Sequence, residues 1–368
     1  MNRVGVLGAG QLGRMLALAG YPLGLRFRFL DPASEAPAEH LAERLAHGFH
    51  DSAALHRFTD GLVAVTYEFE NVPVELVRQL ARDLYVFPSP AALEASQDRL
   101  SEKSLFHRLG LPTAPFAVVQ TRAELDRAVA EIGLPAVLKT RRFGYDGKGQ
   151  ARLRSPRDVE SAWETLVGHP LLLEGFVSFE RELSQIAVRA RDGSMAFYPL
   201  VENHHGEGIL RLSLAPAPNL TPDLEALARA HAARVLEDLD YVGVLTIEFF
   251  EQDGRLIANE MAPRVHNSGH WTIEGAATSQ FENHLRAGLG WPLGSTETAV
   301  PCAMVNLIGT APDAVKVLAI PDAHLHLYGK SQRPGRKLGH VTLRAPSAEV
   351  LLERLAQLRS AIAGERGP

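Results

Sequence analysis

The sequence has one cysteine, no long apolar run and no excess of positive charge, and each absence excludes a class of protein. A single thiol, Cys302, excludes an internal disulfide framework, and its apolar surroundings (AVPCAMVNLI) are typical of a small core residue. No apolar run approaches the length that crosses a membrane, and residues 1–10 lack the apolar core of a signal peptide. We therefore expect a cytoplasmic protein with no membrane partner.

The charge balance argues against a nucleic-acid partner. The formal net charge is −5 at pH 7, although a local basic pocket for a small phosphate is compatible with that value. The chain has 368 residues, of which 46% are hydrophobic and 22% charged, so it can form two or three domains with their own cores. It contains no internal repeat and no low-complexity tract.

The first segment, VGVLGAGQLGRM, predicts a buried strand, a turn with Gly8-x-Gly10-x-x-Gly13, and a helix through about residue 20. A second strand, LRFRFLD, ends at Asp31. This pattern is a dinucleotide-binding fingerprint, but any tight turn that meets a phosphate or a close packing contact needs the same glycines. Asp31 precedes Pro32 and is equally compatible with a simple turn. Further strands at GLVAVTYEF and LYVFPSP complete a doubly wound domain ending near residue 90.

Two acidic residues, Glu68 and Glu70, follow the strand GLVAVTYEF. The carboxyl end of a parallel strand is where open α/β sheets bind ligands. Capping of the following turn at residues 71–73 explains the same residues equally well.

A basic, glycine-rich loop follows the strand that ends at Lys139 (LPAVLKTRRFGYDGKGQ), after a helix predicted over SQDRLSEKSLFHRLG. Glycines free backbone amides to wrap phosphate oxygens, while Lys139 and Lys148 supply positive charge. The loop lacks the Ser or Thr of a P-loop and leads into a strand at residues 151–153. A solvated hairpin tip is the alternative.

The segment LTIEFFEQDGRLIANEM predicts a β-hairpin that turns at Asp253-Gly254. In a tight hairpin Glu248 and Glu260 lie near or directly opposite one another. Each would raise the pKa of the other unless a cation lies between them, and a hard divalent cation suits such a site. Two glutamates on a solvated sheet face are the alternative.

The segment after this hairpin, from Arg264 to Thr272, is almost entirely polar, which is typical of a loop that forms a site. His266 and His270 have zinc-like spacing, but the intervening Asn-Ser-Gly is poor helix and no third ligand is near, so we do not expect zinc.

The last part of the chain predicts a small terminal unit after a break at residues 290–298. It contains a strand (PCAMVNLIG), a loop (HLHLYGKSQRPGRKLGHVTL) and an amphipathic helix over residues 347–363. The predicted buried face of that helix contains Leu351, Leu352, Leu355, Leu358 and Ile362. Four cations of the loop surround Pro334-Gly335 and mark either a hydrated loop or an anion site: Lys330, Arg333, Arg336 and Lys337.

The order of these motifs resembles the N5-carboxyaminoimidazole ribonucleotide synthetases of de novo purine biosynthesis, a family of ATP-grasp carboxylate–amine ligases. The motifs are GAGQLGRM, TYEFENVP, GYDGKGQ, LEGFV, NEMAPRVHNSGHWT and GRKLGH, and together they span essentially the whole chain. GYDGKGQ is typical of the superfamily, whereas APRVHNSGHWT is specific to this family.

The resemblance implies a multidomain α/β and α+β fold. It comprises a Rossmann-like substrate-binding domain (residues 1–95), an ATP-grasp small lobe (96–176), an ATP-grasp large lobe with the metal hairpin (177–295) and a small β-rich C-terminal domain (296–368). It also implies ATP and Mg²⁺ as cofactors, with Mn²⁺ as a substitute, small-molecule substrates and a homodimer.

The resemblance also implies site residues. Glu248 and Glu260 would be the metal ligands. The ATP-binding residues would be Arg99, Lys139, Gly144, Tyr145, Asp146, Gly147, Lys148, Gly149, Gln150, Glu174, Gly175, Phe176, Val177, Glu182, His205, Asn259 and Glu260. Strict strand alternation points Asn259 away from Glu260, so a nucleotide role for both requires a local irregularity.

The aminoimidazole ribonucleotide, with its 5′-phosphate at the first glycine turn, would contact Gln11, Leu12, Tyr145, Asp146, Arg264, His266, Asn267, Ser268, Lys330, Arg336 and Lys337. Carboxyphosphate, formed from bicarbonate and ATP, would be held by Arg264, His266 and Lys330. Because carboxyphosphate is short-lived in water, the site must close, which a glycine-hinged loop can do. His266 is the expected proton acceptor, since a free imidazole titrates near neutrality. The alternative is another ATP-grasp ligase, such as a formate-dependent glycinamide ribonucleotide transformylase; a dinucleotide-binding regulator is a reading from a different class.

Overall fold

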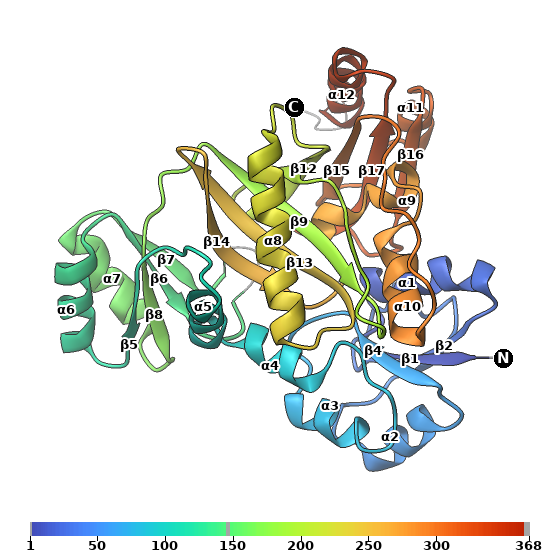
Figure 1. The fold of residues 1–368 in the computed structure, drawn as a ribbon, viewed down its shortest axis with the longest axis horizontal. Coiled ribbons are helices and arrows are strands. Elements are labelled where there is room, and N and C mark those ends of the chain that lie inside the picture. The colour runs from blue at the N-terminus through green and yellow to red at the C-terminus, as the bar shows by residue number, and fades with distance from the viewer. Residues whose placement is uncertain (1, 145–147, 364–368) are drawn as a thin grey trace.

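The computed structural model describes residues 2–144 and 148–363, and the described part of the chain contains three β-sheets (Figure 1). The first sheet is parallel, with the strand order β3-β2-β1-β4, and confirms the predicted Rossmann-like N-terminal domain. The segment LYVFPSP adds only a single bridge between Val65 and Val86. The elements are β1 (Arg3–Leu7), α1 (Gln11–Gly20), η1 (Tyr21–Leu23), β2 (Arg26–Leu30), β3 (Glu43–Leu45), α2 (Ser52–Thr59), β4 (Ala64–Tyr67) and α3 (Val74–Leu80).

The long helix predicted from Ser96 is wrong, because two helices meet there. They are α4 (Pro90–Gln97) and α5 (Arg99–Arg108). Asp98 separates them: its backbone is extended, and its side chain accepts a hydrogen bond of 3.0 Å from Leu100 N. An aspartate at this position is a strong N-cap, so α5 begins a new helical axis.

The second sheet is a small antiparallel one with the order β5-β8-β6-β7, and α6 and α7 belong to the same lobe (Figure 1). Both helices begin with capping boxes, Thr121 with Glu124 and Ser155 with Asp158. The strand predicted after the glycine-rich loop is present as β7. The elements are β5 (Phe116–Val119), α6 (Arg122–Ile132), β6 (Ala136–Thr140), β7 (Gln150–Leu153), α7 (Pro156–Leu166) and β8 (Leu171–Gly175).

The third sheet is the large antiparallel one, ordered β14-β13-β9-β11-β12-β15-β17-β16, with β10 paired to β9. Helix α8 crosses one face of it (Figure 1). Its elements are β9 (Arg181–Arg189), β10 (Met195–Phe197), β11 (Val201–Gly206), β12 (Ile209–Ala215), α8 (Pro222–Asp238), β13 (Gly243–Gln252), β14 (Arg255–Ala262), η2 (Asn267–Gly269), α9 (Thr272–Gly275), α10 (Gln280–Leu289), β15 (Cys302–Ile308), α11 (Ala314–Leu318), β16 (Ala323–Leu327), β17 (Lys337–Arg344) and α12 (Ala348–Ala363).

The C-terminal segment differs from the prediction in two ways. The residues predicted as one loop, HLHLYGKSQRPGRKLGHVTL, mostly form the paired strands β16 and β17, since the alternation of His and Leu is itself a strand pattern. In α12, Leu352 is 62% exposed, so its place on the buried face was wrong. Leu351, Leu355 and Leu358 are buried at helical spacing, and Leu352 lies one residue, about 100°, around the helix from Leu351.

The N-terminal domain and the large sheet share one hydrophobic core. A single buried cluster contains Leu16 of α1, Leu285 of α10 and Val244 of β13. The large sheet also continues into the C-terminal segment, because β12 pairs with β15. These contacts fix the N-terminal domain, the large sheet and the C-terminal strands around one cavity.

Candidate active site

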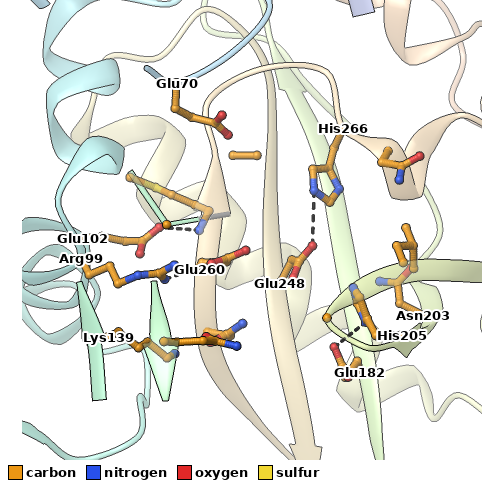
Figure 2. A pocket seen from close by; sticks show the side chains of 18 of the residues that line it. Glu70, Arg99, Glu102, Lys139, Glu182, Asn203, His205, Glu248, Glu260 and His266 are labelled. Atoms are coloured by element: carbon orange, nitrogen blue, oxygen red, sulfur yellow. Dashed lines mark hydrogen bonds and ion pairs between the residues drawn. The ribbon is translucent and has the colours of Figure 1, made fainter. Parts of the chain in front are cut away.

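A cavity of about 1350 Å³ lies where the three sheets meet (Figure 2). Its described lining comes from the first glycine turn, the β4–α3 connection, the small lobe, the β13–β14 hairpin and the segment after that hairpin. Figure 2 shows Glu248 between Arg99 and His205. Most of the residues singled out from the sequence line this cavity: Gln11, Leu12, Arg99, Lys139, Gly144, Lys148, Gln150, Glu174, Gly175, Phe176, Val177, Glu182, His205, Glu248, Asn259, Glu260, Arg264, His266, Asn267 and Lys337.

The β13–β14 hairpin places Glu248 directly opposite Glu260, as the sequence predicts. The pairing shifts immediately after this pair: Phe249 lies opposite Ala258, so Asn259 is an extra residue in β14. This β-bulge is the local irregularity that a cavity-facing position for both Asn259 and Glu260 requires. Both residues line the cavity.

The two carboxylates repel one another. Burial and the Glu260 carboxylate raise the pKa of Glu248 to about 8. Burial also acts to raise the pKa of Glu260, but Arg99 and Lys139 outweigh it and lower that pKa. The Arg99 guanidinium lies 3.1 Å from Glu260 Oε2. The hairpin therefore presents Glu260 as an ionised carboxylate paired with Arg99, and opposite it Glu248, which holds its proton near neutral pH unless a further cation offsets the repulsion.

This pair fits a hard divalent cation that takes its remaining ligands from elsewhere. Within residues 2–144 and 148–363, no three His, Cys, Asp or Glu side chains come together to hold a metal ion by themselves. Mg²⁺ is commonly bound by one or two carboxylates together with phosphate oxygens and water. Two opposed carboxylates beside a cavity large enough for a nucleotide meet that requirement.

Lys139 of β6 points at the same region. Its ammonium donates to Glu174 Oε2 of β8 at 2.8 Å. Helix α5 contributes from below: Glu102 accepts a hydrogen bond of 2.6 Å from Met261 N, and Lys103 lies 3.4 Å from Glu174 Oε2. Glu102 and Lys103 were not singled out from the sequence. Their spacing from Arg99, i+3 and i+4 on one helical face, is the signal that could have found them.

The glycine-rich loop is both a hairpin tip, because it joins β6 to β7, and part of the cavity wall. Gly144, Lys148 and Gln150 line the cavity. Gly149 lies behind it, where its carbonyl accepts a 2.8 Å hydrogen bond from Thr140 N and its φ of +70° favours glycine. Tyr145, Asp146 and Gly147 lie outside the described residues.

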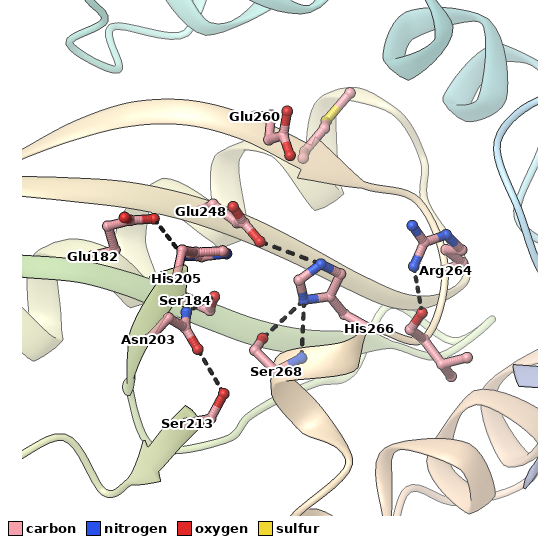
Figure 3. A network of polar contacts seen from close by, with 12 residues as sticks. Glu182, Ser184, Asn203, His205, Ser213, Glu248, Glu260, Arg264, His266 and Ser268 are labelled. Carbon is pink, nitrogen blue, oxygen red and sulfur yellow. Dashed lines mark hydrogen bonds and ion pairs between the residues drawn. The ribbon is translucent and has the colours of Figure 1, made fainter. Parts of the chain in front are cut away.

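The opposite wall is formed by β9 and β11. His205 Nδ1 lies 2.8 Å from Glu182 Oε2. Burial acts to lower the pKa of His205, but this contact and the Glu248 carboxylate outweigh burial and raise it. Asn203, which was not predicted, lines the cavity and is fixed by Ser184 and Ser213 at 2.6 and 2.8 Å (Figure 3).

The polar segment after the hairpin turns back on Glu248. The His266 ring contacts Ser268 Oγ through Nδ1 at 2.8 Å, and its Nε2 lies 3.3 Å from Glu248 Oε1 (Figure 3). Arg264 pairs with Glu70 at 2.6 Å. Glu70 lines the cavity and its carboxylate faces a cation of the protein itself, so a role in ligand binding stays a prediction.

The prediction that His266 has an ordinary pKa near neutrality is wrong. Burial, followed by the positive charges of Arg264 and Lys337, lowers its pKa well below the ordinary value. The imidazole is therefore neutral and able to accept a proton, but it is a weak base. Its role as the acceptor stays a prediction. His270, the other imidazole of the segment, packs against Phe281 and His340.

The first glycine turn is filled by the protein's own carboxylates. Glu68 accepts hydrogen bonds from Gly10 N and, at 2.6 Å, from Gly13 N. Asp31 accepts from Ala9 N at 2.6 Å and from Ala33 N at 2.8 Å. A Cβ on residue 10 would lie 2.6 Å from Glu68 Oε1, so the close approach of Glu68 explains that glycine. Glu68 therefore caps α1, and Asp31 joins the first glycine turn to its own turn at Ala33. The turn amides and the acidic residue on which the dinucleotide interpretation depends are both occupied by these contacts.

The remaining predicted cations border the cavity. Lys330 donates to Gln11 Oε1 at 2.5 Å, and Arg336 pairs with Glu35 at 2.6 Å. Burial and then the neighbouring Arg336 lower the pKa of Lys330 to about 8. Four of the predicted site residues that the structure describes are not part of the cavity lining: Gly149, Ser268, Lys330 and Arg336.

Three family models match the chain in succession. A ribonucleotide synthetase preATP-grasp domain matches residues 1–97, an ATP-grasp domain matches 104–281, and a phosphoribosylaminoimidazole carboxylase C-terminal domain matches 302–354. This succession agrees with the fold class expected from the sequence.

Named relatives cover nearly the whole chain. The N5-carboxyaminoimidazole ribonucleotide synthase of Pseudomonas aeruginosa is 54% identical over 98% of this chain and 99% of its own. The crystal structure of the synthetase from Thermus thermophilus has a TM-score of 0.94 and 56% identity and covers 99% of this chain and 100% of that one. The synthase of Aspergillus clavatus, solved in complex with ADP and 5-aminoimidazole ribonucleotide, has a TM-score of 0.91 and 34% identity, with 99% of both chains covered.

Proposed function

The chain belongs to the N5-carboxyaminoimidazole ribonucleotide synthase family, and from that premise we propose the reaction it catalyses. It is an ATP-dependent carboxylate–amine ligase, which carboxylates 5-aminoimidazole ribonucleotide with bicarbonate and releases ADP and phosphate. The names of the relatives support 5-aminoimidazole ribonucleotide as the substrate and its carboxylation as the reaction. They do not support the alternative, a formate-dependent glycinamide ribonucleotide transformylase.

The single observation that carries the proposal is the opposed pair Glu248 and Glu260, with the cations Arg99 and Lys139 beside it. Phosphoryl transfer depends on positioning and on stabilising the charge of the transferring group. A carboxylate pair for a divalent ion, next to fixed cations in one cavity, provides both.

The nucleotide occupies the part of the cavity between the small lobe and the large sheet. Lys139 and the loop from Gly144 to Gln150 bind its phosphates, residues 174–177 hold the adenine, and Glu182 binds the ribose. Lys139 and the described loop residues Gly144, Lys148 and Gln150 lie on the β6–β7 side and Glu182 on the β9 side of the same cavity, which supports this arrangement. Arg99, His205 and Asn259 complete the nucleotide contacts.

Glu248 and Glu260 would hold Mg²⁺, for which Mn²⁺ can substitute. When bound, the ion supplies positive charge that offsets both the carboxylate repulsion and the phosphate charge. The raised pKa of Glu248 supports this assignment, because its causes are burial and then the Glu260 carboxylate, which is the other proposed ligand.

The substrate ribonucleotide lies between the first glycine turn and the segment 264–268. Since Glu68 occupies the turn amides, the cations Arg336 and Lys337 carry the main attraction for its 5′-phosphate, with Gln11, Leu12 and Lys330 also in contact with the substrate. This modifies the expectation that the turn itself receives the phosphate.

The chemistry couples phosphoryl transfer to bicarbonate with carboxylation of the substrate's amine. A bicarbonate oxygen attacks the γ-phosphorus of ATP, and the bond from that phosphorus to the β–γ bridging oxygen breaks. The products are carboxyphosphate and ADP, which is the leaving group. Carboxyphosphate decomposes to carbon dioxide and phosphate. The exocyclic amine of the substrate then attacks carbon dioxide, forms the C–N bond and loses a proton. Arg264, His266 and Lys330 hold the carboxylating species, and His266 accepts the proton.

The decisive experiment measures ADP release with ATP, magnesium and bicarbonate, with and without 5-aminoimidazole ribonucleotide. We expect the ribonucleotide to stimulate turnover and a labelled bicarbonate carbon to appear in the product. Turnover that ignores the ribonucleotide contradicts the proposal, and turnover that requires formate in place of bicarbonate selects the alternative ligase.

We also propose a cytoplasmic homodimer. In the described residues, no helix has both the length and the apolar character needed to cross a membrane. Light scattering on the purified chain tests the dimer, and fractionation of the source cells tests the compartment.

A further inference from the structure

Lys103 is a lysine with 1% of its side chain exposed, in the first half of α5. It lies below the cavity wall to which Glu174 and Lys139 belong. Its ammonium is 3.4 Å from Glu174 Oε2 and 3.5 Å from the carbonyl oxygen of Ala258 in β14. Lysines are almost never buried to this extent unless they are paired. Its pairing with Glu174 is what permits this burial.

Glu174 shares one oxygen between two ammonium groups. Oε2 is 2.8 Å from Lys139 Nζ and 3.4 Å from Lys103 Nζ, while Oε1 is buried without a hydrogen-bond partner in the described part of the chain. Burial alone would raise the pKa of Glu174, but Lys139 and Lys103 together lower it to about 2. Glu174 is therefore an ionised carboxylate in a buried site with two cations.

Only one of the two cations can reach the cavity. In the proposed function Lys139 binds the phosphates of ATP, and it must then share or leave its contact with Glu174. A buried charge that loses its partner is strongly destabilising. Lys103, held behind Glu174 by its burial, stays beside Oε2 when Lys139 moves.

We propose that Lys103 is a positioning residue, which compensates the charge of Glu174 so that Lys139 is free to bind the nucleotide's phosphates. This inference rests on the proposed role of Lys139. Without Lys103, Lys139 would be the one cation in direct contact with Glu174 among the described residues, with Arg99 acting from farther away. The phosphates would then have to compete with the Glu174 carboxylate for Lys139.

The test compares binding of ADP with magnesium and binding of adenosine, by calorimetry, in the wild-type chain and in Lys103→Met. Methionine keeps the volume and unbranched shape of the buried side chain. Glu174 keeps Lys139 as a partner and the buried Glu102 keeps its hydrogen bond from Met261 N, so we expect the variant to fold. We expect ADP to bind about tenfold more weakly, or worse, and adenosine to bind as before, because adenosine has no phosphate for Lys139. Lys316→Met, at an exposed lysine of α11, is the matched control and changes neither.

A double-mutant cycle isolates the pairwise effect. In a Glu174→Gln background there is no carboxylate to compensate, so Lys103→Met should no longer weaken ADP binding. Equal loss of ADP and adenosine binding, no loss of either, or a full loss that persists in the Glu174→Gln background overturns the inference. Failure of the ribonucleotide to stimulate turnover would instead contradict the proposed function and leave these binding results standing.

Discussion

At the scale of single residues, three cations in or beside the site are each paired with a carboxylate of the protein itself. Arg264 contacts Glu70, Arg336 contacts Glu35, and Lys139 contacts Glu174. Each of these cations is held near its working position by a carboxylate. A phosphate or carboxylate ligand therefore exchanges one anion for another instead of ordering a free side chain, which lowers the entropy that binding costs.

The carboxylate pair gives the first prediction at this scale. Glu248→Gln and Glu260→Gln should each reduce bicarbonate-dependent ATP turnover at least about a hundredfold and raise the magnesium concentration needed for half-maximal rate, because each removes a charged metal ligand. Steady-state assays across a magnesium titration measure both effects. Glu353→Gln, at an exposed glutamate of α12, is the control. Parent-like rates at low magnesium would disprove the metal role.

The contacts of a site residue could be predicted from the sequence where its partner lies nearby in the chain. The Glu248–Glu260 pair follows from a turn at Asp253-Gly254 and strand geometry, and the structure has that pairing. Glu68 could not be resolved in the same way: it contacts Gly10 and Gly13 from 58 and 55 residues away. A local pattern contains no information about which distant side chain fills a turn, so the sequence left two readings of Glu68 open.

At the scale of elements, patterns with a clear period were predicted well, and boundaries were not. The prediction began one helix at Ser96 and missed the break at Asp98, although aspartate is a common N-cap. In α12 the period was right but the buried stripe was drawn one residue too wide. Leu352 belongs to neither the core nor its margin.

Helix α12 offers a paired test of that difference. Leu358 is fully buried and Leu352 is 62% exposed. Leu358→Ala should lower the free energy of unfolding by about 2–5 kcal/mol, whereas Leu352→Ala should change it by no more than about 0.5 kcal/mol. Urea denaturation followed by circular dichroism measures both. Equal destabilisation by the two substitutions would refute the assignment of the buried face.

At the scale of the whole molecule, the three regions that match separate family models do not correspond to three separate sheets. The large sheet runs from β14 to β16 and includes strands on both sides of the break predicted near residue 295. Sequence patterns suggest separate units there because a linker interrupts the periodicity. They do not show that β12 and β15 pair across it.

His284 of α10 joins the N-terminal domain to the large sheet. Its Nε2 lies 2.9 Å from Thr66 Oγ1 in β4, and its Nδ1 accepts a hydrogen bond of 3.0 Å from Val244 N in β13. Burial lowers its pKa to about 3. Both ring nitrogens are used in this contact, which requires the neutral ring to remain in place.

This joint predicts how stability depends on pH. The unfolded histidine takes up a proton as the pH falls through about 6.5, and the folded one does not until far lower pH. The unfolded state is therefore favoured as the pH falls, by up to about 1.4 kcal/mol per pH unit from this residue alone. Guanidinium denaturation at pH 7, 6 and 5 should show stability falling with pH.

The substitution His284→Gln separates this residue from the other titrating groups. The variant should be less stable at pH 7, by about 1–3 kcal/mol, because Val244 N loses its acceptor, yet its stability should fall less between pH 7 and 5. His56→Gln, at an exposed histidine, should keep the parental slope. An unchanged slope in His284→Gln would exclude the joint as the source.

The extra residue at position 259 changes the parity of β14. Before it the even-numbered Leu256 and Ala258 face the hydrophobic core, and after it the odd-numbered Met261 does. Residues of β14 on both sides of the bulge thus face the same core, and Asn259 and its neighbour Glu260 both face the cavity. A transplant of this hairpin into another scaffold would have to keep the extra residue, because in a regular strand one of those two side chains would point into the apolar interior.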